Sequence, residues 1–378
     1  MHRRSFLNAA GFAAAGTVLG AGTPATAVRK ATYQSSSTSR RLRVLMLGGT
    51  GFLGPTIVET LLDRGHDVTL FNRGVTNPHL FTYLEKLRGD REEENGGPDL
   101  GALRGRDWDV VIDTWQKGPK CVEDTARLLS GHARIYYYIS SISVYHNTAF
   151  RQLGTTETAQ LSDIEGHPIN RKPDEQSYFL RKTLAEKVLA ENFEGEVGIL
   201  RSHGIRGARI NTPESEHYWP VKIWRGGDVL APEDGQTWGQ FTDTVSLCRF
   251  LAHCAENDLA GPYNVLSSPF RLKEFFDAIQ NVSHRKANLI WTPREKLAEF
   301  DIEPYRDLPM WRPEPVGFYR FSSDKAVQVG FRHRSLEACA ASMLHGYIER
   351  HPEDDFVFGR RGQITDEKEA EVLTALGR

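Results

Sequence analysis

The sequence predicts an α/β fold in which a doubly wound parallel sheet is followed by a smaller C-terminal lobe. Short apolar runs alternate with segments of helical periodicity through the first half of the chain. A glycine-rich turn joins the first apolar run to the first helical segment. After about Gly204 the alternation loosens into mixed short segments. Such regular alternation is typical of a parallel sheet with helices on both faces.

The expected elements follow one another in strand–helix order. Each expected strand is a short apolar run, and each expected helix carries its apolar residues on one face. Strands are expected over 41–47, 66–74, 108–115, 134–145 and 195–202, and helices over 55–65, 122–131 and 178–192. The domains expected from this pattern are a dinucleotide-binding Rossmann-like domain over 41–204, a substrate lobe over 205–345 with segments that return to the sheet, and a helical tail over 346–378.

The N-terminal segment has the features of an export signal. Arg3 and Arg4 precede a mildly apolar Ala/Gly-rich run, and Ala25-Thr26-Ala27 gives a small-x-small cleavage pattern. The paired arginines resemble the bacterial twin-arginine signal, whose route carries folded proteins. We therefore expect a signal over 1–27, a flexible Ser-rich leader over 28–40, and a periplasmic or extracellular protein. The alternative interpretation is a basic N-terminal tail.

The composition excludes several classes of function. The chain has 378 residues, of which 39% are hydrophobic, and a net charge of −2. This charge balance gives no basic surface for nucleic acid, and no run after the signal is long enough to cross a membrane. The four cysteines have no zinc spacing and are expected to be small buried side chains. The thirteen histidines are dispersed, so no metal site is expected.

The glycine-rich turn is the main binding motif. Gly48, Gly51 and Gly54 form G-x-x-G-x-x-G between a strand and a helix. Glycine lets the backbone approach a pyrophosphate, and the helix N-terminus offers N–H groups and a partial positive charge. The turn therefore predicts an NAD(P) site, with Phe52 and Leu53 as further candidates for cofactor binding.

The end of the second strand bears on the choice of dinucleotide. NAD sites usually place an acidic residue there for the ribose hydroxyls, whereas this end reads Asn72-Arg73, and Asp67 lies at the start of the strand. Because an arginine can pair with a 2′-phosphate, we expect a preference for NADP, with Asn72 and Arg73 among the cofactor-binding residues. Arg73 is alternatively a surface turn residue, and Asp90 either binds the adenine amine or caps a turn.

A tyrosine and a lysine are the catalytic candidates. Tyr178 and Lys182 form Y-x-x-x-K on an expected helix, and this spacing places both side chains on one face. A nearby ammonium lowers the pKa of a phenol, so Tyr178 is a candidate acid/base. A serine at the end of the strand before it could hydrogen-bond a substrate oxygen. The alternative is a surface tyrosine beside a surface lysine.

Five stretches in a fixed order carry a resemblance to a known family. GGTGFLG, SSISVY, YFLRK, LRSHGIRG and GPYNV resemble the extended branch of the short-chain dehydrogenase/reductase superfamily, the NAD-dependent epimerase/dehydratase proteins. The resemblance covers about residues 42–345. It implies that Tyr178 is the acid/base, that Lys182 tunes it and binds the nicotinamide ribose, and that Ser141, four residues before Tyr145, orients the substrate.

Some positions depart from the family pattern. Phe179 replaces a small residue, Ser202 replaces a proline, and Ser246 stands where many members have aspartate. Ser140 and Ser143 are weaker candidates than Ser141 for the catalytic serine. The departures weaken inference about the substrate more than they weaken the assignment of the serine, tyrosine and lysine.

Three functions remain open. The first is a redox-neutral epimerase or dehydratase of a sugar or sugar nucleotide, which returns each hydride and therefore suits an exported bacterial protein without a supply of free cofactor. The second is an NADP(H)-dependent reductase or dehydrogenase of a small carbonyl compound. The third is a non-catalytic nucleotide-binding protein. The resemblance also implies a possible homodimer, formed through the helix that carries Tyr178.

Overall fold

Seven strands form one parallel sheet in the computed structural model. Their order is β11-β6-β5-β4-β1-β2-β3. From β1 the chain runs outward to β2 and β3, and then returns to β4 on the other side, so the strand order reverses between β1 and β4. Ligands of doubly wound folds bind at this point, beyond the carboxyl ends of the strands. The strands are β1 (Arg43–Leu47), β2 (Asp67–Asn72), β3 (Lys86–Arg88), β4 (Trp108–Asp113), β5 (Ala133–Ser141), β6 (Glu196–Ser202) and β11 (Gly261–Val265).

The structure describes residues 40–92, 98–172, 176–208, 213–359 and 363–378. Arg3, Arg4 and the rest of the expected signal and leader up to residue 39 lie outside the described residues. Residues from Arg40 onward form one compact unit, and the domain boundary near residue 204 stays a prediction. Within the described ranges, no helix has the length and apolarity that a membrane span requires.

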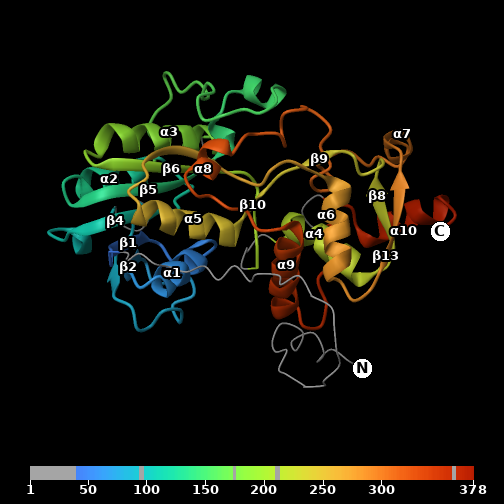
Figure 1. Ribbon diagram of the computed structural model, residues 1–378, viewed down its shortest axis with the longest axis horizontal. Helices are drawn as coiled ribbons and strands as arrows, with labels where there is room; N and C mark the ends of the chain where they lie inside the picture. Colours follow the sequence, from blue (N-terminus) through green and yellow to red (C-terminus); the bar gives the residue numbers. More distant parts are fainter. Residues whose placement is uncertain (1–39, 93–97, 173–175, 209–212, 360–362) are drawn as a thin grey trace, which may run out of the picture. The chain divides into compact units, whose positions relative to one another are not determined.

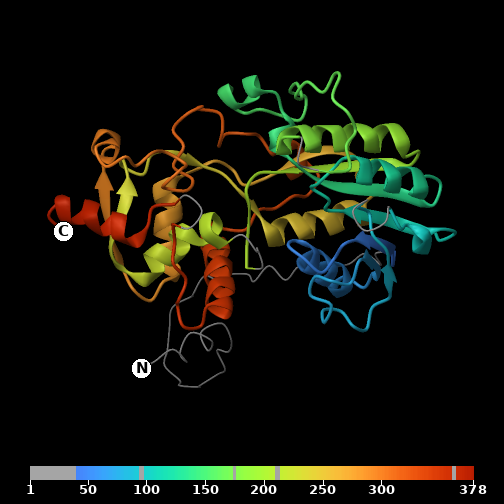
Figure 2. The ribbon, with the colours of Figure 1, turned by 180° about the vertical axis from the view of Figure 1, so that it is seen from behind.

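Helices cover both faces of the sheet. Helices α2 and α3 lie on one side, and α1 and α5 lie on the other (Figures 1 and 2). Each side buries its own hydrophobic cluster, because alternate residues of β1, β4 and β5 point to opposite faces. The predicted fold class is confirmed. The helices are α1 (Gly54–Asp63), α2 (Lys120–Leu129), α3 (Tyr178–Asn192) and α5 (Thr244–Glu256).

A third hydrophobic cluster holds the later part of the chain together. It is built mainly by three helices and by the parallel strand pair β8–β13. Strand β11 and helix α5 belong instead to the main sheet and its cover, although they follow residue 204. The elements of this part are β8 (Gly227–Pro232), β13 (Ala287–Thr292), α4 (Pro213–Arg225), α6 (Leu272–Val282), α7 (Arg294–Ala298), α8 (Asp324–Gln328), α9 (Leu336–Arg350) and α10 (Asp366–Ala375), with the two-residue strands β7 (Ile205–Arg206), β9 (Trp238–Gly239), β10 (Thr242–Asp243) and β12 (Phe270–Arg271).

The structure corrects two expected elements. The tail from residue 346 is helical only in part, because α9 ends two residues before Pro352 and α10 begins at Asp366. The expected strand over 134–145 ends at Ser141, where a short 3₁₀ turn begins. The four cysteines are buried and unpaired, which confirms their assignment as core side chains.

Candidate active site

The glycine turn lies at the switch point of the sheet and opens onto a cavity. Gly48 and Gly49 have φ angles of +111° and +95°, which favour glycine. A Cβ added to Gly54 would lie 2.7 Å from the backbone of Gly49, so the turn can close only with glycine at this position. Gly48, Gly49 and Gly51 line a cavity of about 310 Å³. The bare backbone facing this cavity fits the phosphates of a dinucleotide.

The other two cofactor-binding candidates in the turn, Phe52 and Leu53, do not line this cavity. Leu53 is buried in the hydrophobic core and does not line the cavity. Phe52 lines a second cavity. Asn72 holds the turn in place, because its amide donates to the Gly48 carbonyl at 2.9 Å. Its contribution to the site is therefore to fix the backbone of the turn.

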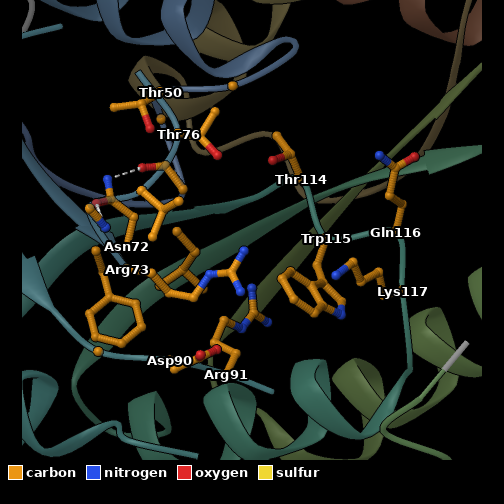
Figure 3. Close-up of a pocket in the computed structure, with 18 residues that line it drawn as sticks. Thr50, Asn72, Arg73, Thr76, Asp90, Arg91, Thr114, Trp115, Gln116 and Lys117 are labelled. Carbon is orange, nitrogen blue, oxygen red and sulfur yellow. Dashed lines mark hydrogen bonds between the residues drawn. The ribbon is translucent and has the colours of Figure 1, made fainter. Parts of the chain in front are cut away.

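Charged residues gather at the end of the cavity beside β2 (Figure 3). Arg73 and Asp90 both line the cavity. The Asp90 carboxylate accepts a hydrogen bond from the Glu92 backbone N–H at 2.9 Å, so it caps a turn as well. Arg73 is paired with Glu92, whose carboxylate lies 3.5 Å away. This ion pair offsets the charge on which the expected NADP preference depends, and the geometry around Arg73 gives that preference no support.

A buried ion pair, which the sequence did not reveal, lies beside the cavity, and its arginine lines it. Arg91 donates to both oxygens of Asp113 at 2.9 and 2.7 Å, and Tyr136 donates to the same carboxylate at 2.7 Å. Burial acts to raise the pKa of Asp113, but the Arg91 guanidinium outweighs it and holds that pKa below its ordinary value. The guanidinium also lies 4.9 Å from the ring centroid of Trp115, which lines the cavity. The pair therefore fixes the loops after β3 and β4.

Ser141, Tyr178 and Lys182 meet in the second cavity, of about 250 Å³. Ser141 is the last residue of β5, and Tyr178 begins α3; both line this cavity. Tyr178 is 43% exposed, but desolvation of its phenol still raises its pKa, although Ser141 and Arg181 act to lower it. Lys182 is not among the groups that shift this pKa, so the expected activation of the phenol by lysine is not seen. Tyr178 accordingly keeps its proton and is a proton donor.

The ammonium of Lys182 is directed toward the ends of β4 and β5. Its ammonium donates to the Trp115 carbonyl at 2.8 Å, the Tyr138 hydroxyl at 2.9 Å and the Ile139 carbonyl at 2.7 Å. Its side chain is almost fully buried, and this burial lowers its pKa to about 7. These bonds tie α3 to the ends of β4 and β5. Lys182 reaches a ligand only by exchanging one of the three acceptors.

A buried hydrogen-bond network lies next to Ser141 and is centred on Glu186 and Arg201. Glu186, one turn after Lys182, accepts from Ser140 at 2.5 Å and pairs with Arg201 through both oxygens at 3.1 and 2.7 Å. Arg201 donates to the Tyr145 hydroxyl at 3.0 Å. Burial raises the pKa of Tyr145 to about 12, which keeps its hydroxyl protonated as a donor. Ser140 thus belongs to this support, and Ser141 is the serine that faces Tyr178.

The glycine-turn cavity and the second cavity adjoin each other. Thr114 and Gln116 line both the glycine-turn cavity and the catalytic cavity. Ser143, whose hydroxyl donates to Ser141 at 3.0 Å, lines a third cavity of about 750 Å³ on the other side. The arrangement places Tyr178 and Ser141 between the glycine turn and the residues that line a larger cavity. The third cavity is also lined by three phenylalanines and two arginines, Phe150, Phe179, Phe318, Arg151 and Arg312.

The chain matches one family model and several curated proteins. Residues 44–265 match the model of the NAD dependent epimerase/dehydratase family. The Epimerase family protein YfhF of Bacillus subtilis is 22% identical over 267 residues, which are 65% of this chain and 80% of that protein. The Chloroplast stem-loop binding protein of 41 kDa b of Arabidopsis thaliana is 23% identical over 322 residues, 73% of this chain and 81% of that protein. A 3 beta-hydroxysteroid dehydrogenase/Delta 5-->4-isomerase of Mycobacterium tuberculosis is 46% identical over 56 residues, only 15% of either chain.

Solved structures share the fold. WbmG of Bordetella bronchiseptica, in complex with NAD and UDP, gives a TM-score of 0.57 at 15% identity, covering 84% of this chain and 98% of that one. UDP-glucose 4-epimerase of Bifidobacterium longum, with NAD+ and UDP, gives 0.56 at 16% identity, covering 82% and 99%. Vestitone reductase of alfalfa gives 0.54 at 19% identity, covering 82% and 99%. At this level of identity the likeness shows the fold.

Proposed function

The chain belongs to the NAD dependent epimerase/dehydratase family. We propose that it binds NAD(P) and transfers hydride reversibly between this dinucleotide and a sugar nucleotide or a related sugar derivative. One observation carries the proposal: the glycine-turn cavity and the catalytic cavity share Thr114 and Gln116. A dinucleotide held at the turn would therefore extend toward Ser141 and Tyr178. The solved neighbours bound to NAD and UDP support the same interpretation.

The chemistry is divided between the dinucleotide and the protein. When bound, the dinucleotide supplies the acceptor and donor of the hydride. In the carbonyl-reducing direction Tyr178 donates its phenol proton to the substrate carbonyl oxygen as the carbon receives hydride. In the alcohol-oxidising direction the phenol must first have lost that proton, and the phenolate takes the proton of the alcohol as hydride leaves the carbon. Ser141, which lines the same cavity as Tyr178, orients the same oxygen. Lys182 fixes the start of α3 against the strand ends.

The side chains that line the third cavity are suited to a substrate that has a ring and an anionic group. Phe179, which follows Tyr178, and Phe318 line this cavity and offer apolar faces. Arg312 also lines it, lies 3.8 Å from the Phe318 ring centroid, and donates to the backbone carbonyl of Glu314, which lines the cavity as well; among the described residues its guanidinium forms no ion pair. A guanidinium of this kind is suited to phosphate. A sugar nucleotide meets both requirements.

A panel of UDP-sugars with added NAD tests the proposal. Product isomers or dehydrated sugars, detected by NMR without net change in absorbance at 340 nm, are the expected result. Net oxidation of NADPH with a small carbonyl compound would instead favour the reductase. Failure to convert any compound, together with failure to bind either dinucleotide, would contradict the proposal and favour a protein without dinucleotide chemistry.

We propose that the protein is exported in its folded state to the periplasm or beyond. The motif at Arg3 and Arg4 carries this proposal. Replacing both with lysine is expected to leave folded protein in the cytoplasm, because twin-arginine receptors read the arginine pair as an address. Cell fractionation followed by immunoblotting measures the distribution. Undiminished export of the double variant would contradict the proposal.

A further inference from the structure

Three charged side chains form a linked group at the glycine-turn cavity, in which Glu92 pairs with two cations that line it. Glu92 lies between two cations, with one oxygen 2.6 Å from the Lys117 ammonium and the other 3.5 Å from the Arg73 guanidinium. Arg73 and Lys117 both line the cavity and are about half exposed, whereas the Glu92 side chain is only 12% exposed. The carboxylate is therefore the fixed centre of this group.

The fold holds Glu92 in this position. The preceding residue, Arg91, is clamped to Asp113 at the end of β4 by two hydrogen bonds. The Glu92 backbone N–H is bound by the Asp90 carboxylate at 2.9 Å. These two contacts anchor the backbone on the N-terminal side of Glu92, and the Lys117 ammonium holds its carboxylate at 2.6 Å.

We propose that Glu92 determines the choice of dinucleotide and makes the site select NAD over NADP. This inference rests on the proposed dinucleotide binding. The acidic residue that NAD sites usually carry at the end of the second strand is absent here, and Glu92 supplies a carboxylate from the loop after the third strand. This carboxylate repels a 2′-phosphate and already occupies the arginine that would bind one.

The substitution Glu92→Gln tests whether the Glu92 carboxylate, and not only the presence of Arg73, sets the relative affinity for NAD and NADP. It keeps the shape of the side chain but frees two cations for a 2′-phosphate. The affinity for NADP is expected to rise by about 10- to 100-fold, the range of a charge-assisted contact, while the affinity for NAD changes little or falls. Adding Arg73→Ala to Glu92→Gln is expected to remove most of the gain.

A surface carboxylate provides the matched control. Glu85 pairs at 2.6 Å with Arg106, which does not line the cavity, whereas both cations paired with Glu92 do, so Glu85→Gln is expected to leave both affinities unchanged. Titration calorimetry of the full chain with NAD+ and with NADP+ gives the dissociation constants directly, and circular dichroism checks the fold of each variant.

The outcomes are distinguishable. A wild-type chain that prefers NAD, combined with a gain of NADP affinity in Glu92→Gln alone, supports the inference. A wild-type preference for NADP, or equal changes for both dinucleotides in Glu92→Gln, overturns it while leaving the proposed function intact. A wild-type chain that binds neither dinucleotide contradicts the proposed function, and the inference fails with it.

Discussion

Tyr178→Phe is expected to lower turnover by about 10²- to 10⁴-fold, the usual contribution of a positioned acid/base. The phenylalanine keeps the ring, which lies 5.9 Å from the Arg181 guanidinium, and removes only the hydroxyl. The change should therefore leave folding and dinucleotide affinity nearly intact. Steady-state kinetics on the sugar nucleotide that the panel identifies, with calorimetry for dinucleotide binding, give the two quantities.

A substitution at the neighbouring Phe179 serves as the control for Tyr178→Phe. Phe179 is also exposed on α3 and lines the third cavity rather than the catalytic one. Phe179→Leu is expected to act mainly on KM, because it changes the wall of the third cavity and no proton-transfer group. Unchanged turnover in Tyr178→Phe would remove Tyr178 from the mechanism.

Arg91→Met is expected to lower the free energy of unfolding by about 3–5 kcal/mol, the usual cost of breaking a buried ion pair by removing one partner. Asp113 has no exposed surface and would lose the guanidinium that binds both its oxygens. Urea unfolding of the variant and the wild type measures the difference. The matched change on the surface is Arg106→Met, which breaks the pair with Glu85 and should cost less than about 1 kcal/mol.

The pH dependence of the free energy of unfolding shows whether the loss of stability in Arg91→Met comes from the charge of Asp113. In the wild type the folded-state pKa of Asp113 is lowered, so its stabilising contribution is present above the unfolded pKa and is lost as pH falls. Without Arg91, burial would raise this pKa above the unfolded value, and stability would fall as pH rises. The deficit of Arg91→Met should therefore be larger at pH 8 than at pH 5. A deficit independent of pH would indicate lost packing alone.

Local patterns in the sequence predicted the sheet and its principal motifs. The strand over 41–47, the glycines after it and the helix that follows are coded within about twenty consecutive residues, and periodicity detects such units. Tyr178 and Lys182 share a helix, so their spacing predicted a common site. The direction of Lys182 depends on acceptors from β4 and β5, which helix spacing cannot reveal.

Pairings between distant segments could not be predicted in the same way. Arg91 and Asp113 are separated by 22 residues, and Glu92 reaches Lys117 across 25. No local pattern marks such partners, because the fold alone brings them together. The expected NADP preference depended on Arg73 without knowledge of its partner, and the expected lowering of the Tyr178 pKa depended on helix spacing without knowledge of burial.

The central claim is that this chain holds a dinucleotide at the glycine turn, beside Ser141 and Tyr178. Mass spectrometry of nucleotide released on denaturing the purified protein tests it most directly. An enzyme that returns each hydride retains its cofactor, and a ligand that binds only the folded state stabilises that state. The account predicts that NAD or NADH is released in an amount approaching roughly one per chain. Purified protein that releases no dinucleotide, and takes up none when titrated with NAD or NADP, would contradict it.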